Sequence, residues 1–141
     1  MIDKNPLGGT VGLGHTRWAT HGGVSEQNAH PHVASNKVAI VHNGIIENYK
    51  VIKSNLQTKG YDVSSETDSE VLAHLFAQAF DSGLSPSEAI REVINVIEGA
   101  YAFAAISIDF PKLSRISVMF DGVLCVSLIS CEFPGFLGIC F

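Results

Sequence analysis

Residues 38–60 read VAIVHNGIIENYKVIKSNLQTKG, an apolar run that leads into an Asn-Gly pair and then an amphipathic segment. The run Val38–His42 is typical of a buried strand that ends in a sharp turn at Asn43-Gly44. An Asn-Gly pair usually marks a hairpin. The apolar residues that follow recur instead at helical spacing, namely Ile46, Tyr49, Ile52 and Leu56. With Gly60 as the stop signal, the stretch predicts strand, turn and helix in that order.

Two further helices are predicted by their start signals. Thr67-Asp-Ser-Glu70 has the pattern of a capping box, in which Thr and Glu satisfy each other's backbone N–H groups. Ser85-Pro-Ser-Glu88 repeats the pattern with proline at the first helical position. The segment Tyr101–Ile108 then has the length and apolar character of a strand. Adjacent helices between strands predict a mixed α+β domain.

Length and charge exclude several classes of protein. The chain has 141 residues, with 9 Lys+Arg against 14 Asp+Glu, which gives a net charge of −5. This size suits one domain, and the absence of a Lys/Arg run argues against a nucleic-acid partner. All three cysteines lie from Cys125 onward, which is not how a disulfide framework is spread. With no secretory signal at the start, we expect a cytoplasmic location.

The composition changes near Arg115. Residues 1–115 carry every Lys, Arg and His, whereas Asp121 and Glu132 are the only charges in residues 116–141. We therefore predict a domain over 1–115 and a hydrophobic, Cys-containing tail over 116–141. A shifted or read-through reading frame is the interpretation we favour for the tail.

A membrane anchor is the alternative for that tail, because Gly122–Phe141 is mostly apolar. Glu132 and Pro134 inside it, and the lack of a flanking basic residue, argue against an anchor. We therefore expect no membrane partner.

Polar residues concentrate between Gly14 and Asn48, and five of the six histidines lie there: His15, His21, His30, His32 and His42. A metal site is one interpretation. The spacing fits no helix-borne ligand pair and no cysteine joins them, so we expect no metal and interpret several of these histidines as hydrogen-bonding groups that hold loops.

The same region also suits recognition of an amino acid. The Arg17 guanidinium can hold a carboxylate with two parallel hydrogen bonds, and Thr20 and His21 can add donors. Asp68 could hold an ammonium group, although an acid at this position can also simply favour a helix start. Asn43 and Gly44 could present a side-chain amide and a backbone N–H to a developing oxyanion.

Four segments carry a resemblance to a known family: HTRWATHG at 15–22, NAHPH at 28–32, HNGIIENY at 42–49 and SETDSE at 65–70. They resemble the N-terminal glutaminase domain of glutamine–fructose-6-phosphate aminotransferase (isomerizing), a class II glutamine amidotransferase. Other class II amidotransferases share parts of the pattern and remain an alternative. The resemblance implies hydrolysis of the amide of L-glutamine, with the ammonia passed on to make glucosamine 6-phosphate.

The resemblance also implies a role for each site residue. Arg17 corresponds to the residue that binds the α-carboxylate of glutamine, with Thr20 and His21 beside it, and Asp68 to the partner of the α-ammonium group. Trp18 corresponds to a loop tryptophan that shields the site. Asn43 and Gly44 correspond to the oxyanion hole.

The family implies a fold and partners too. The expected fold is part of a four-layer αββα sandwich of the N-terminal-nucleophile hydrolase type, with strands missing at both ends. No cofactor is expected. Fructose 6-phosphate would be reached only through sugar-isomerase domains that lie outside this sequence, and full-length members are expected to be homo-oligomers.

One departure from the family concerns the nucleophile. The family uses an N-terminal cysteine whose own amine acts as general base, whereas this sequence begins Met-Ile-Asp-Lys. We therefore expect this chain on its own to be inactive. A non-catalytic glutamine- or glutamate-binding fragment, or a fragment of another class II amidotransferase, is the alternative.

Overall fold

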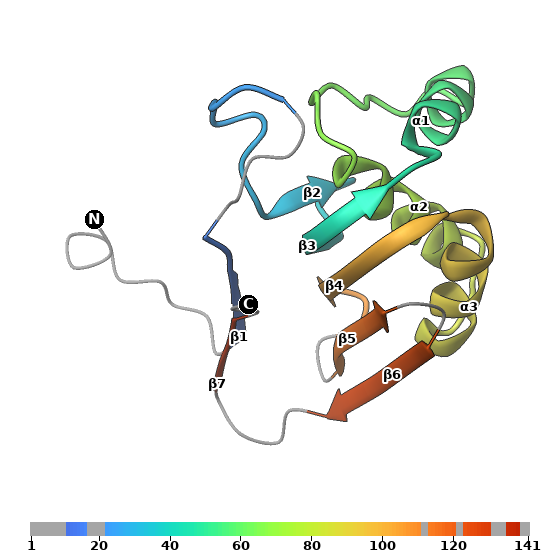
Figure 1. The fold of residues 1–141 in the computed structure, drawn as a ribbon. Coiled ribbons are helices and arrows are strands. Elements are labelled where there is room, and N and C mark those ends of the chain that lie inside the picture. Colours follow the sequence, from blue (N-terminus) through green and yellow to red (C-terminus); the bar gives the residue numbers. More distant parts are fainter. Residues whose placement is uncertain (1–10, 17–21, 111–112, 121–122, 131–134, 139–141) are drawn as a thin grey trace.

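The structure is a computed structural model, and it describes residues 11–16, 22–110, 113–120, 123–130 and 135–138. Three helices cover one face of a five-stranded antiparallel sheet (Figure 1). The helices are α1 (Tyr49–Thr58), α2 (Glu70–Asp81) and α3 (Pro86–Val96). The sheet has the order β2-β3-β4-β5-β6, with strands β2 (His32–Ala34), β3 (Val38–Ile46), β4 (Gly99–Ser107), β5 (Leu113–Phe120) and β6 (Val123–Ser130). These elements confirm the predicted α+β class.

A second, two-stranded sheet lies on the side of the main sheet away from the helices (Figure 1). It consists of β1 (Val11–Gly14) and β7 (Gly135–Gly138), which pair in parallel. The β1 strand lies against β3 and β4. No helix among the described residues is long and apolar enough to cross a membrane.

The two faces of β3 and β4 have different neighbours, because successive side chains in a strand point to opposite faces. One face contributes Ile40, Ile46 and Phe103 to the core that the helices cover. Phe103 meets Phe76 of α2 edge to face, with 5.5 Å between ring centroids. On the other face, the small or medium side chains Val41, Ala102 and Ala104 are also buried, but outside that core.

The predicted turn at Asn43-Gly44 is wrong. Both residues lie inside β3, where Asn43 pairs with Ala102 and Gly44 with Tyr101. The strand continues to Ile46, and α1 begins only at Tyr49. Pairing with β4 over nine residues thus overrides the local turn preference of Asn-Gly.

The predicted capping box at Thr67 is also wrong, whereas the one at Ser85 is confirmed. Ser85 and Glu88 each bond the other's backbone N–H at the start of α3, with Pro86 as its first residue. At α2 the N-cap residue is Ser69, not Thr67. The Thr67 hydroxyl instead contacts the hydroxyl of Ser65 and the ring of His32. The tertiary partners of this loop therefore decide where α2 begins.

Candidate functional site

The predicted site residues fall into two groups. Four of them, Arg17, Trp18, Thr20 and His21, lie outside the described residues. The other three, Asn43, Gly44 and Asp68, are described, and all three belong to one region around the second half of β3.

Asn43 lies on the face of the sheet that points away from the helices. By strand alternation it shares this face with Val41, and its paired residue Ala102 is buried there. Asn43 Oδ1 is 2.7 Å from His15 Nε2, a contact between the end of β1 and the middle of β3. The histidine thus holds one end of the side-chain amide.

Gly44 adopts a backbone conformation that side chains disfavour. Its φ is +112°, and a Cβ atom here would lie 2.2 Å from the carbonyl oxygen of Ala100 on β4. A distance this short means that no other residue fits without moving the paired strand. The peptide after Asn43 is therefore fixed in its orientation while Gly44 itself stays exposed.

Asp68 is held against the end of the same strand. Its side chain is 2% exposed, and Oδ2 accepts a hydrogen bond from the backbone N–H of Ile46 at 2.9 Å. The Ser69 hydroxyl lies 3.5 Å from Oδ1. Asp68 therefore does more than precede a helix, because it joins the loop before α2 to β3 only two residues after Gly44.

A row of histidine rings connects the Asn43 side chain to the loop that carries Asp68. The rings of His15 and His30 are 4.3 Å apart, and those of His30 and His32 are 4.9 Å apart. His32 Nε2 lies 3.0 Å from the hydroxyl of Thr67, next to Asp68 in sequence. His15 and His32 thus act as hydrogen-bonded groups, with the ring of His30 packed against both. In the described part of the chain, no three His, Cys, Asp or Glu side chains come together as a metal site would need.

The loop around Asn28 is joined to the loop around Glu66, a contact that the sequence analysis missed. The Asn28 amide donates to the Gly23 carbonyl at 3.0 Å and to Glu66 Oε2 at 3.1 Å, and its oxygen accepts from Glu66 N at 2.9 Å. Glu66 also accepts from Gly23 N, and this bond together with that from Asn28 lowers the pKa of its carboxyl. The segment that follows His21 is thereby fixed to the loop that carries Asp68.

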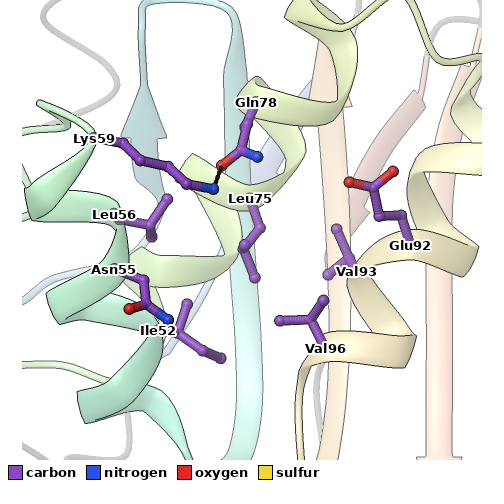
Figure 2. A pocket seen from close by; sticks show the side chains of 9 residues that line it. All are labelled: Ile52, Asn55, Leu56, Lys59, Leu75, Gln78, Glu92, Val93 and Val96. Carbon is purple, nitrogen blue, oxygen red and sulfur yellow. Dashed lines mark hydrogen bonds between the residues drawn. The ribbon is translucent and has the colours of Figure 1, made fainter.

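A groove is also present on the helix side of the molecule, away from Asn43. It has a volume of about 230 Å³ and lies between α1, α2 and α3. Figure 2 shows Lys59 reaching toward Gln78 across it, with 3.3 Å between Nζ and Oε1. Its lining is mixed, with apolar residues such as Leu56 and Val93 beside polar ones such as Asn55 and Glu92.

Comparison with known families matches residues 15–117 to the glutamine amidotransferase domain. The chain belongs to this family. The match includes His15, Asn43, Gly44 and Asp68, so the whole described site lies within the amidotransferase domain.

Similar curated proteins narrow the likeness further. The chain is 45% identical over 111 residues to glutamine–fructose-6-phosphate aminotransferase (isomerizing) of Idiomarina loihiensis, and 53% identical over 113 residues to that of Gluconobacter oxydans. These alignments cover 79% and 80% of the chain but 18% of each relative. The chain therefore spans less than a fifth of the length of these relatives.

Two solved structures share the fold. The glutamine phosphoribosylpyrophosphate amidotransferase of B. subtilis, in complex with ADP and GMP, superposes with a TM-score of 0.59 at 26% identity. A structure described as the allosteric regulatory enzyme of purine biosynthesis gives 0.61 at 28% identity. Each covers 74% of this chain and 22% of the solved chain.

Proposed function

We propose that this amidotransferase domain binds L-glutamine and serves hydrolysis of its side-chain amide, so that the ammonia passes to fructose 6-phosphate in a longer protein of the aminotransferase (isomerizing) type. The observation that carries the proposal is the hydrogen bond from Ile46 N to Asp68. It keeps an anionic side chain beside the strand that presents Asn43 and Gly44. An anion and a pair of hydrogen-bond donors are what the two ends of glutamine require.

Each group has a distinct part in the proposed reaction. The Asn43 amide and the Gly44 N–H donate to the carbonyl oxygen of the substrate as it gains negative charge. This lowers the barrier to attack on the carbonyl carbon by the N-terminal cysteine that the family uses and that this sequence does not contain, and the amide nitrogen then leaves as ammonia. The buried Asp68 carboxylate receives the α-ammonium group. Arg17, Thr20, His21 and Trp18, outside the described residues, are assigned the α-carboxylate and the cover of the site.

The fold is assigned in the same way. We infer that the helices and the five-stranded sheet are two layers of a four-layer αββα sandwich. The β1–β7 sheet on the opposite face supports this inference, because it is where a second sheet would pack.

Calorimetric titration with L-glutamine tests the role of Asp68. The variant Asp68→Asn keeps the shape of the side chain and an oxygen for the Ile46 N–H, but removes the charge. Since a hydrogen bond to a charged group contributes about 1.5–3 kcal/mol, we expect roughly 10- to 100-fold weaker binding.

Asp81→Asn is the matched control. Asp81 lies at the exposed end of α2 and pairs with Lys37, so its loss should leave glutamine affinity unchanged. Equal binding by wild type and Asp68→Asn, or no binding by the folded wild-type chain, would contradict the proposed function.

A further inference from the structure

We propose that His15 is a positioning residue, which decides whether Asn43 presents its NH2 group or its oxygen to the substrate. This inference rests on the proposed function, because it concerns the amide assigned to the oxyanion. It adds a residue that directly follows a different strand, β1, to the groups that build the site.

The contact joins two elements that are far apart in sequence. His15 follows β1 directly, and β1 lies against β3 and β4 on the sheet face away from the helices. His15 Nε2 and Asn43 Oδ1 are 2.7 Å apart, and both side chains are partly buried. At this distance a hydrogen lies between the two side chains: either Nε2–H donates to the amide oxygen, or the amide is turned over and its NH2 donates to a bare Nε2.

The two ends of an Asn side chain have nearly the same shape, so only hydrogen-bond partners distinguish them. A neutral histidine has one N–H and one bare nitrogen. If Nε2 carries the hydrogen, it donates to Oδ1, and the NH2 of Asn43 remains for the substrate. If Nε2 is bare, the amide turns over and its oxygen faces the substrate, where it would repel a developing oxyanion.

The surroundings of His15 favour the first arrangement. Its other nitrogen, Nδ1, is buried and has no hydrogen-bond partner among the described residues. The ring of His30 packs against the ring of His15, with 4.3 Å between the ring centroids. A hydrogen on Nδ1 would be a buried donor without an acceptor, which native structures largely avoid. The hydrogen therefore belongs on Nε2, where Asn43 Oδ1 accepts it.

The first experiment reads the position of the hydrogen directly and needs no ligand. Long-range ¹H–¹⁵N NMR of the histidine-labelled chain distinguishes the two neutral forms of each ring. The His15 signals are assigned by their loss in His15→Gln. We expect the hydrogen on Nε2, and a neutral ring with the hydrogen on Nδ1 would overturn the proposal.

The second experiment compares two variants by calorimetry with L-glutamine. His15→Leu has similar bulk but no donor, so Asn43 loses its fixed orientation, and we expect about 3- to 10-fold weaker binding. His15→Gln can offer an amide N–H to the same oxygen and should recover most of the lost affinity. A purely structural effect would weaken both variants alike.

The outcomes separate this inference from the proposed function. Loss of glutamine binding in His15→Leu with recovery in His15→Gln supports the positioning role. Wild-type affinity in His15→Leu, or equally weak binding by both folded variants, would overturn it while the Asp68→Asn result still stands. Failure of the proposed function appears instead as no glutamine binding by wild type. If His15→Leu fails to fold, the NMR measurement on the wild-type chain decides.

Discussion

Two features of the structure require glycine at position 44. A positive φ of +112° keeps it in a region that L side chains rarely occupy, and the paired strand leaves no room for a Cβ atom. Asn43, its neighbour, is held through its side chain by His15. Backbone and side chain are thus fixed independently at adjacent positions, and both proposed oxyanion donors are preorganised before substrate arrives.

The variant Gly44→Ala should therefore be destabilised by two separate effects. The backbone conformation alone costs about 1–2 kcal/mol for a residue with a side chain. The contact with the Ala100 carbonyl adds to this cost, because the strands must move apart. Urea unfolding followed by circular dichroism measures the total loss.

Gly83→Ala is the matched control for that measurement. Gly83 also has a positive φ, of +82°, but nothing lies within 4 Å of where its Cβ would be. It should lose only the backbone part. If the two variants lose the same stability, the predicted clash at Gly44 is absent.

At the scale of elements, the start of α2 depends on Glu70. This side chain accepts hydrogen bonds from the backbone N–H groups of Ser64 at 3.2 Å and Ser65 at 2.6 Å, and it lies 3.8 Å from His74 one turn later. Burial by itself would raise the pKa of Glu70, but the bonds from His74, Ser65 and Ser64 outweigh it and hold the pKa at about 2. The carboxylate therefore ties the loop of residues 64–69 to the helix.

This low pKa predicts a dependence of stability on pH. The pKa of Glu70 in the unfolded chain is near 4.5, so its contribution to the free energy of unfolding is complete above that pH. It decreases as the pH falls from about 4.5 to about 2, as protons bind first to the unfolded chain. From the shift in pKa, the contribution at neutral pH is up to about 3 kcal/mol.

Urea unfolding of wild type and Glu70→Gln across pH 2–7 checks this expectation. The variant should be less stable at pH 7, and the difference should narrow as the pH falls below about 4.5. Glu88→Gln serves as control, because Glu88 occupies the first turn of α3 but is exposed, so its loss should be smaller. A stability difference for Glu70→Gln that stays constant with pH would contradict the assignment.

At the scale of the whole molecule, one aromatic contact joins the helix layer to the sheet. Phe76 of α2 is 1% exposed and meets Phe103 of β4 with 5.5 Å between ring centroids, and it also lies 6.0 Å from Phe80. Because α2 carries the loop of Asp68 at its start, the packing of this helix also sets the position of the site. The core contacts that stabilise the fold therefore also position the candidate site.

Replacing Phe76 by alanine should cost about 3–5 kcal/mol of the free energy of unfolding, through lost burial and the cavity left behind. Val51→Ala on α1 is the control, since Val51 is 63% exposed and its loss should stay within about 0.5 kcal/mol. Urea unfolding measured by circular dichroism gives both values. A loss below about 1 kcal/mol for Phe76→Ala would show that the helix layer is not held through this contact.

Local signals predicted the elements whose stabilising partners are close in sequence. The Ser85-Glu88 capping box and Gly60 after α1 act within a few residues, so helix α3 and the end of α1 were predictable. The course of β3 through Asn43-Gly44 was not, because pairing with β4 decides it. Strand β1 was missed for the same reason, because its partner β7 lies at the other end of the chain. Strand β2 pairs with the neighbouring β3, but its three residues are too few to show a periodic pattern.

The candidate site was likewise predictable only in part from local sequence. Residue chemistry pointed to Asn43, Gly44 and Asp68, but not to how they are held. The contacts that hold them come from His15, Asn28 and Ile46, each more than twenty residues from its partner in sequence. No pattern within one segment carries that information, since it exists only once the strands pair.

The pairing of β3 with β4 has a kinetic consequence. Its closest register pair, Ile46 with Gly99, encloses the entire helical segment, so the sheet cannot close until that segment has doubled back. Closing a flexible loop of this length costs about 3–4 kcal/mol of chain entropy before any strand contact repays it. Formation of the helices shortens the flexible chain between Ile46 and Gly99. The capping residues that stabilise these helices should therefore also affect the rate of folding. We therefore expect the proposed oxyanion donors at Asn43 and Gly44 to form late in folding, after α1, α2 and α3 have brought the two strands together.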